Sequence, residues 1–209
     1  MHILLVDDHE VVRRGLRQLL AEAWPQAEFG EVGGLPAARE ALGLQAWDLV
    51  LLDINLPDGS GLELLGETRQ RCPKAAVLVL SAYPEQEFAV RAFKLGAAGY
   101  LTKASVAEEM LLAARRVLQG GRYVSAVLAE HMAAVLGPGH QQAPHETLSP
   151  REMAVLRQVA QGRTIKEIAA DLCLSDKTVS TYRSRISEKL GLGSSVELTR
   201  YALQNGLVD

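Results

Sequence analysis

The sequence predicts an α/β fold in two parts, a five-stranded parallel sheet wound with helices on both faces and a smaller all-α domain behind it. Short aliphatic runs alternate five times with helix-length amphipathic segments over the first 120 residues. Three of those runs are continuously apolar, which is typical of strands that are covered on both faces. A segment rich in Gly, Pro and Gln then precedes a region that carries helix signals only.

The strands and helices of the first part follow from local signals. Residues 10–23 have apolar side chains at helical spacing, and Pro84 and Gly96 suit the first turn and the end of one helix. The predicted strands are 2–6, 27–32, 49–53, 75–83 and 98–103. The predicted helices are 10–23, 35–44, 60–72, 84–96 and 105–121. Parallel strands joined by helices in this way predict a doubly wound, flavodoxin-like sheet.

The C-terminal region reads as four short helices. Ser149 with Glu152 forms a capping box, Pro150 suits the first helical position, and Ser175 suits an N-cap. The second and third helices are separated only by a two-residue connection, which is typical of a helix-turn-helix. The predicted organisation is therefore a first domain over 1–121, a linker with a short helix over 122–146, and a helix-turn-helix domain over 147–209.

Charge and cysteine content limit the class of protein. Residues 1–121 carry 12 Lys and Arg against 16 Asp and Glu, whereas residues 147–209 carry nine against seven. An acidic front and a mildly basic tail suggest two tasks. Cys72 and Cys173 stand alone, so neither a disulfide framework nor a zinc site is predicted. The first apolar run is too short for a signal peptide or a membrane span, and we expect a cytoplasmic protein without membrane contact.

Acidic and polar residues close several predicted strands. Asp7 and Asp8 end the first, Asp53 the third, Ser81 the fourth and Lys103 the fifth. The carboxyl ends of parallel strands meet at one edge, where ligands bind. Gathered carboxylates repel one another unless a cation joins them, and Mg²⁺ is bound by such oxygen ligands. This edge therefore predicts a pocket for a phosphoryl group with one carboxylate as nucleophile. By itself Asp7 or Asp8 would more often be a helix cap than a ligand, and Asp58 is predicted to be only a turn or cap residue.

The stretches "VDDHE", "LLDINLPDGSGLELL", "VLVLSAY" and "GAAGYLTK" resemble the receiver domain of bacterial response regulators over about residues 1–120. The resemblance implies that Asp53 accepts phosphate from a sensor histidine kinase. It implies that Mg²⁺ is held by Asp8, Asp53 and the backbone carbonyl of Asn55, with Asp7 assisting through water. Ser81 and Lys103 would bind the phosphoryl oxygens, and Tyr100 would turn inward when Ser81 moves. Such domains often have a cis peptide after the lysine, here Lys103–Ala104.

A polar, locally basic helix face lies in the C-terminal region. On a helical wheel of residues 175–190, Val179, Tyr182, Ile186 and Leu190 share the packed face. The opposite face carries small polar residues beside basic ones, as a helix entering the DNA major groove does. By itself this pattern is more typical of a solvated helix face than of a DNA-contacting one.

The segment "LSPREMAVLRQVAQGRTIKEIAADLCLSDKTVSTYRSRISEKLGL" resembles the LuxR-type helix-turn-helix, so the whole chain resembles the NarL/FixJ family of response regulators. That family implies contacts with double-stranded DNA. Base edges would be read by Ser180, Thr181 and Ser184. Phosphates would be held by Lys177, Thr178, Tyr182, Arg183 and Arg185. Cys173 departs from the glycine common at its turn, where a positive φ would cost about 1 kcal/mol.

The resemblance also implies a homodimer that pairs through the final helix, with Val196, Leu198, Tyr201 and Ala202, when the protein is phosphorylated or bound to DNA. One tail can neutralise few phosphates, which favours two copies on adjacent half-sites. Phosphorylation would control DNA binding, and the chain would be no enzyme beyond catalysing its own phosphoryl transfer and dephosphorylation.

Three alternatives remain open on the residues alone. A phosphohydrolase of the haloacid dehalogenase type places its two acids two residues apart on the first strand, whereas here Asp7 and Asp8 are adjacent and Asp53 lies on the third. A nucleotide-cofactor enzyme is disfavoured because no G-x-G-x-x-G motif follows a strand. A receiver that dimerises without phosphate is disfavoured by the complete acidic set.

Overall fold

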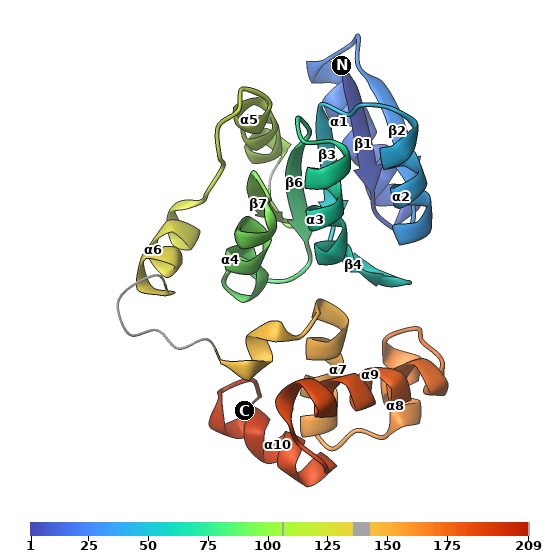
Figure 1. Cartoon of the computed structure of the whole chain (residues 1–209), viewed down its shortest axis with the longest axis vertical. Helices are drawn as coiled ribbons and strands as arrows, with labels where there is room; N and C mark the ends of the chain where they lie inside the picture. Colours follow the sequence, from blue (N-terminus) through green and yellow to red (C-terminus); the bar gives the residue numbers. More distant parts are fainter. Residues whose placement is uncertain (106, 136–142, 209) are drawn as a thin grey trace. The chain divides into compact units, whose positions relative to one another are not determined.

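The computed structural model describes residues 1–105, 107–135 and 143–208. It divides the chain into two units, Met1–His140 and Gln141–Asp209 (Figure 1). The predicted linker, 122–146, is therefore shared between the units, and its residues 136–142 lie outside the described part of the chain.

Five parallel strands form the sheet of the first unit, in the order β2-β1-β3-β6-β7. They are β1 (His2–Val6), β2 (Glu28–Val32), β3 (Leu49–Asp53), β6 (Ala76–Ser81) and β7 (Gly99–Thr102). All five residues of β3, the central strand, are buried, which explains its unbroken apolar run. This order is that of a flavodoxin-like sheet, and the predicted fold class is confirmed.

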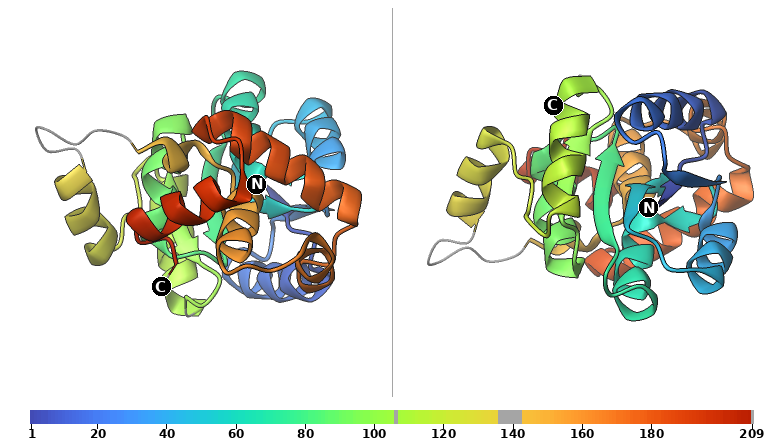
Figure 2. Two further views of the ribbon diagram at one scale, coloured as in Figure 1. Left: turned by 90° about the horizontal axis from the view of Figure 1, so that it is seen from below. Right: turned by 90° about the horizontal axis from the view of Figure 1, so that it is seen from above.

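Helices cover both faces of this sheet. They are α1 (Glu10–Ala23), α2 (Leu35–Leu44), α3 (Gly61–Arg71), α4 (Glu85–Leu95) and α5 (Ala107–Leu118). Helices α1 and α5 lie on one face, and α2, α3 and α4 lie on the other (Figure 2). On the α1–α5 face, alternate strand residues such as Ile3, Leu51 and Leu80 form one buried cluster with Leu20 and Val117. Burial on both faces fixes the register of the strands, and with it the residues at their carboxyl ends.

A short hairpin between β3 and α3 was not predicted. Strands β4 (Asn55–Leu56) and β5 (Gly59–Ser60) pair antiparallel around the turn that contains Asp58. Both carboxylate oxygens of Asp58 accept a hydrogen bond from the Leu35 backbone N–H, at 3.0 Å each. Asp58 thus supplies a side-chain cap to α2, whose own N-cap is Gly34. The cap role is confirmed, but the capped helix begins 23 residues earlier in the chain.

The first residues after α5 are held on the sheet unit. The Tyr123 N–H donates to the Ala98 carbonyl at 2.9 Å, and the Tyr123 hydroxyl donates to Glu109 at 2.9 Å. Ser125 donates to the carboxylate of Glu85, at the first turn of α4. Helix α6 (Ala126–Val135) then packs on α4 and buries Leu128 completely. The described part of the linker helix is therefore an addition to the first unit.

The second unit contains four α-helices among its described residues. They are α7 (Pro150–Ala160), α8 (Ile165–Asp171), α9 (Asp176–Leu190) and α10 (Ser195–Gln204). The predicted capping box at Ser149 and Glu152 is present, and Ser175 caps α9. The Glu152 carboxylate, 2% exposed, also accepts from Lys189 of α9 at 2.6 Å, which joins α9 to the start of α7.

The end of the predicted linker belongs to this second unit. Residues Pro144–Thr147 form a 3-10 helix, η1, at the boundary predicted between the linker and the helix-turn-helix domain. The His145 ring and the Tyr201 hydroxyl are 3.0 Å apart, and the His145 N–H donates to the same hydroxyl at 3.3 Å. Burial lowers the pKa of His145 and favours the neutral ring in this contact. The polar composition of the segment did not indicate this packing because the partner lies 56 residues away.

Cys72 is buried and Cys173 is exposed, and neither forms a disulfide. Cys173 has φ 54°, so the positive φ considered for the turn between α8 and α9 is present. Among the described residues, no helix combines the length and the apolar character needed to cross a lipid bilayer.

Gly61 is the point where α3 comes closest to the end of β3. A Cβ at this position would lie 2.2 Å from the Asp53 carbonyl oxygen and 2.8 Å from the Ile54 Cα, and neither backbone atom can move aside cheaply. We therefore expect Gly61→Ala to lower the free energy of unfolding by about 3 kcal/mol. Urea unfolding followed by circular dichroism measures the effect.

Gly66 in the same helix provides the matched control, because no atom lies within 4 Å of its added Cβ. Gly66→Ala should raise the free energy of unfolding by about 0.5–1 kcal/mol, since alanine is the better helix former. Equal effects of the two substitutions would contradict the close approach at Gly61.

Candidate functional site

The polar residues that close the strands meet at the carboxyl edge of the sheet. Asp7 follows β1, Asp53 ends β3, Ser81 ends β6, and Lys103 follows β7. Asp7 and Asp53 are each 2% exposed, and Ser81 is fully buried. The predicted gathering of these side chains at one edge is present in the structure.

Lys103 joins the two buried carboxylates. Its Nζ lies 2.6 Å from Asp7 Oδ2 and 2.7 Å from Asp53 Oδ2. Two carboxylates this close repel each other strongly in a buried setting, and the ammonium group offsets that repulsion. Lys103 therefore bridges the two acids at the carboxyl edge of the sheet.

The pKa values of this group reflect burial and mutual charge. Burial raises the pKa of Asp53, and Lys103 only partly counters the rise. Burial lowers the pKa of Lys103, but the charges and hydrogen bonds of Asp53 and Asp7 outweigh it, so that the net pKa lies above its ordinary value. A cation added beside Asp53 would stabilise its charged form.

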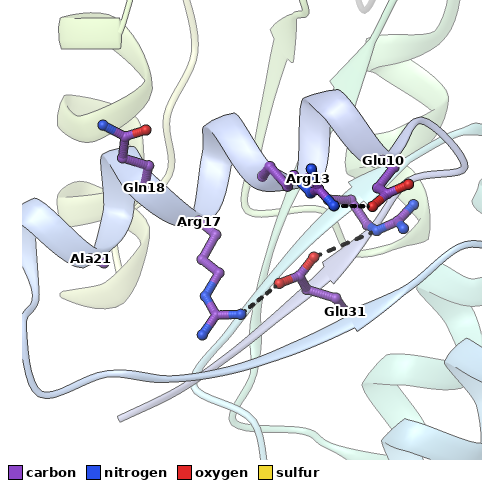
Figure 3. A pocket seen from close by; sticks show the side chains of 7 residues that line it. Glu10, Arg13, Arg17, Gln18, Ala21 and Glu31 are labelled. Carbon is purple, nitrogen blue, oxygen red and sulfur yellow. Dashed lines mark hydrogen bonds and ion pairs between the residues drawn. The ribbon is translucent and has the colours of Figure 1, made fainter.

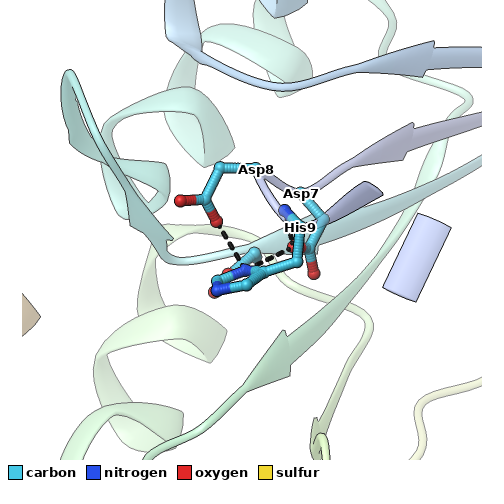
Figure 4. Close-up of side chains that lie close together, drawn as sticks. Asp7, Asp8 and His9 are labelled. Atoms are coloured by element: carbon cyan, nitrogen blue, oxygen red, sulfur yellow. Dashed lines mark hydrogen bonds and ion pairs between the residues drawn. The ribbon is translucent and has the colours of Figure 1, made fainter. Parts of the chain in front are cut away.

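Asp8 and His9 complete the cluster. His9 Nδ1 lies 2.7 Å from Asp8 Oδ1 and 3.1 Å from Asp7 Oδ1, as Figure 4 shows. Asp7, Asp8, His9 and Asp53 each offer one ligand atom, and these four atoms lie within 4.8 Å of one another. Sequence reasoning named the three acids but not His9, although its position directly after Asp7 and Asp8 was a signal.

The donor set suits a divalent cation. Carboxylate oxygens from three aspartates are hard ligands, and two of these residues are buried, where unneutralised charge is costly. Asn55 lies next to the site, and its N–H donates to Asp53 Oδ1 at 2.8 Å. The acidic cluster is thus consistent with Mg²⁺, and the ligand role of the Asn55 carbonyl stays a prediction.

Ser81 and Tyr100 lie beside the acids. The Ser81 Oγ accepts from the Tyr83 N–H at 3.0 Å, and the Tyr100 hydroxyl donates to the Tyr83 carbonyl at 3.4 Å. Tyr100 is fully buried, which raises the pKa of its phenol well above the ordinary value. The Tyr100 ring is already inward in the structure, and its turning when Ser81 moves stays a prediction.

The peptide after Lys103 is trans, so the suggested cis bond is wrong. A cis bond without proline costs about 3 kcal/mol and needs surrounding contacts that enforce it. The trans form already allows Lys103 to reach both carboxylates, and its N–H donates to the Ser81 carbonyl at 2.7 Å.

Helix α1 is tied to the same edge by arginine side chains that line a surface pocket (Figure 3). Arg13 donates to the Asp7 carbonyl at 2.6 Å, and its Nε lies 3.7 Å from Glu31. Arg17 pairs with Glu31 at 3.0 Å. These contacts fix the main chain of Asp7 from the α1 side, a role that sequence reasoning did not assign.

Helix α9 presents the polar face that the wheel predicted. Val179 and Ile186 are fully buried, and Tyr182 is 8% exposed on the same packed face. The exposed members of the predicted DNA-contact set are Lys177, Thr181, Arg183, Ser184 and Arg185. Ser180 and Thr178 are half-buried, and Tyr182 is the least accessible member of the set.

Only part of the predicted pairing surface on α10 is open. Val196 is 79% exposed, whereas Leu198 and Ala202 are buried and Tyr201 contacts His145. The two buried residues pack α10 against α7 within the unit, because the helix must cover that core before it can present a surface. Leu203, which was not predicted, is 51% exposed on the same helix.

A parallel sheet with an acidic carboxyl edge, joined to a helix-turn-helix unit, defines the class of regulators that carry a receiver. Residues 3–115 match the response regulator receiver domain, and residues 146–202 match the bacterial regulatory proteins of the luxR family. The chain is 38% identical to "Response regulator GacA" of Pseudomonas aeruginosa, over 99% of this chain and 97% of that protein. It is 34% identical to "Response regulator UvrY" of Escherichia coli K12, over 99% and 95%.

Solved structures agree with this assignment. A two-component response regulator of the LuxR family from Aurantimonas sp. is 34% identical, with a TM-score of 0.58, and the match covers 64% of this chain and 95% of that one. RcsB from Salmonella typhimurium, 24% identical with a TM-score of 0.57, covers 98% of this chain and 99% of its own and shows the shared fold. The chain belongs to the response regulators of the NarL/FixJ family, with a receiver and a luxR-type DNA-binding domain.

Lys103→Gln tests the electrostatics of the site. Removing the ammonium group leaves Asp7 and Asp53 without their shared cation, and we expect the free energy of unfolding at pH 7.5 to fall by on the order of 2 kcal/mol. The pKa of Asp53 is already raised, and it should rise further without Lys103. As pH falls, the folded variant then takes up a proton before the unfolded chain does, so its deficit should shrink at pH 5.0.

Urea unfolding at both pH values, in the presence of a chelator, measures this effect. Lys94→Gln, at an exposed lysine on α4, is the control and should change the free energy of unfolding by less than about 0.5 kcal/mol at either pH. A deficit in Lys103→Gln that does not change with pH would argue against charge repulsion as its cause.

Proposed function

We propose that Asp53 is the phosphoacceptor and that a sensor histidine kinase donates the phosphoryl group. The observation that carries this proposal is the position of Asp53, buried at the carboxyl edge and 2.7 Å from the Lys103 ammonium. The Asp53 carboxylate attacks phosphorus, the bond from phosphorus to the kinase histidine breaks, and the acyl phosphate forms. Ser81 and Lys103 bind the phosphoryl oxygens that carry the spreading charge.

We further propose Mg²⁺ as the cofactor of this reaction. Asp8, Asp53 and the Asn55 carbonyl would ligate the ion directly, and Asp7 would assist through water. The cluster of Asp7, Asp8 and Asp53 oxygens supports this choice because Mg²⁺ prefers oxygen ligands and keeps several waters. The ion supplies neutralisation of the phosphoryl oxygens, while the chain itself positions the acceptor. Turnover of a separate substrate is not part of the proposal: the chain catalyses only its own phosphoryl transfer and dephosphorylation.

The phosphoryl group is proposed to bias a two-state receiver. Ser81 is hydrogen-bonded to Tyr83, and Tyr83 is hydrogen-bonded to the proposed switch residue Tyr100. Helix α4 begins two residues after Tyr83, at Glu85, and Glu85 accepts a hydrogen bond from Ser125 of the linker. A change in the position of Ser81 would therefore alter contacts that reach the linker helix α6. Residues 1–121 would serve as the phosphoacceptor domain, 122–146 as the linker, and 147–209 as the DNA-binding domain.

Helix α9 is proposed to enter the DNA major groove. Its small hydroxyl residues, Ser180, Thr181 and Ser184, would read base edges, and the Thr181 and Ser184 hydroxyls now donate to backbone carbonyls one turn earlier. Lys177, Thr178, Arg183 and Arg185 would hold phosphates, with Tyr182 chiefly packing the helix in place. Two copies of the chain, paired through the exposed part of α10 around Val196, would occupy half-sites one turn of the DNA helix apart. The protein would act in the cytoplasm.

Asp53→Asn provides the central test of the proposal. Wild-type protein should take up label from an acyl-phosphate donor with Mg²⁺, and the variant should not, because an amide cannot act as the nucleophile. Beryllofluoride with Mg²⁺, which mimics the phosphoryl group, should tighten DNA binding of the wild type at least tenfold and leave the variant unchanged. The duplex is first selected from a random pool with the beryllofluoride-treated protein, and fluorescence anisotropy then measures the DNA affinity. Sedimentation of the complex should give two chains per duplex.

The unfolding curve of Asp53→Asn controls for loss of structure, since the amide is similar in shape. Undiminished labelling of the variant would point to a different acceptor. Equal DNA affinity with and without beryllofluoride would remove the switch, although it would leave DNA binding itself in place.

Lys177→Ala and Ser184→Ala separate the two kinds of DNA contact on one helix. Lys177→Ala removes a proposed phosphate contact, so it should weaken binding to every duplex equally and reduce the slope of log K against log salt by about 1. Ser184→Ala removes a proposed base contact, so it should relax the preference for one base pair of the DNA site and leave the salt slope unchanged. Salt titrations on the selected duplex and on point-substituted duplexes distinguish the two, and identical behaviour of the variants would contradict the assigned roles.

A further inference from the structure

His9 is part of the acidic edge in a way that the phosphoacceptor role does not require. Its imidazole comes from the residue directly before α1, and its Nδ1 lies between the carboxylates of Asp8 and Asp7, at 2.7 and 3.1 Å (Figure 4). The His9 N–H also donates to Asp7 Oδ1, at 2.8 Å. Backbone and ring of one residue are thus both directed to the same acid, which limits where the ring nitrogen can lie.

We propose that His9 Nδ1 is a ligand for late first-row ions such as Ni²⁺ at this site, which makes it a mixed nitrogen and oxygen site that takes these ions as well as Mg²⁺. This inference rests on the metal site of the proposed function. Ligands of one small ion lie at most about 4.4 Å apart, given metal–ligand bonds of about 2.0–2.2 Å. The four candidate ligand atoms of Asp7, Asp8, His9 and Asp53 all lie within 4.8 Å of one another, which is close to this limit.

The chemistry of the ring allows this role. A neutral imidazole with its hydrogen on Nε2 presents a lone pair at Nδ1, the atom that faces the two acids. The His9 side chain is 59% exposed, so the ring can change tautomer through solvent and the site remains open to an entering ion. Lys103 pairs with the Oδ2 atoms of Asp7 and Asp53, whereas the His9 ring contacts Oδ1 of Asp7 and Oδ1 of Asp8.

The proposed ligand has a consequence for selectivity. Mg²⁺ gains little from imidazole because it prefers oxygen, whereas Ni²⁺ and Zn²⁺ bind imidazole well and generally bind a given site more tightly. His9 should therefore strengthen binding of the late ions without strengthening binding of Mg²⁺. In a receiver with histidine at this position, the relative concentrations of Mg²⁺ and of late ions such as Ni²⁺ would decide which ion occupies the site.

Isothermal titration calorimetry of the full chain with Mg²⁺ and with Ni²⁺ tests the proposal. All variants carry His2→Gln, because the Met1 amine and His2 are an alternative pair of nickel ligands at the start of the chain. In that background, His9→Gln should weaken Ni²⁺ binding at least tenfold and change Mg²⁺ binding less than threefold. His131→Gln, at a histidine on α6, is the matched control and should change neither.

Competition identifies the shared site. Saturating Mg²⁺ should weaken apparent Ni²⁺ binding in the background protein, and Asp53→Asn should weaken both ions. Unchanged Ni²⁺ affinity in His9→Gln, with Mg²⁺ still bound, would overturn the role of His9 and leave the phosphoacceptor proposal standing. Absence of Mg²⁺ binding in the background protein would overturn the metal site itself, and with it both proposals.

Discussion

The ion pairs of Lys103 with Asp7 and Asp53 are the interaction on which the rest of the site depends. Two carboxylates that are each 2% exposed lie at the ends of adjacent strands, and burial alone would push them towards the neutral form. The ammonium group, at 2.6 and 2.7 Å, lets negative charge persist there. The proposed attack on phosphorus requires a charged Asp53, so under that proposal the same contact would serve both folding and chemistry.

That contact exists only because the chain folds as a parallel sheet. Strands β1, β3, β6 and β7 run in one direction and place their last residues at one edge. The close approach of α3 at Gly61 and the contact of Arg13 with the Asp7 carbonyl hold the loops after β3 and β1 in place. The acidic edge is therefore supported by backbone contacts as well as by charge.

The two ends of the linker are each held by the unit they adjoin. Tyr123 and Ser125 fix its start to β7 and α4, and His145 fixes its end to α10 through Tyr201. The contacts of Ser125 with Glu85 and of His145 with Tyr201 are side-chain hydrogen bonds between residues distant in sequence, which are easier to break than a packed core. The start of the linker also lies on the helix that follows the Ser81 loop, which gives the proposed switch a physical route out of the receiver.

The sequence by itself determined the strands, the helices, the parallel topology and the acidic set, because apolar periodicity and capping residues are local signals. Asp7, Asp53 and Lys103 could be assigned to one site because parallel topology brings strand ends together. Only the tertiary structure decided that Asp58 caps α2, that His9 contacts two acids, and that Leu198 and Ala202 of α10 are buried. Each of these depends on a partner far along the chain or on the direction of a side chain, and no local pattern encodes either.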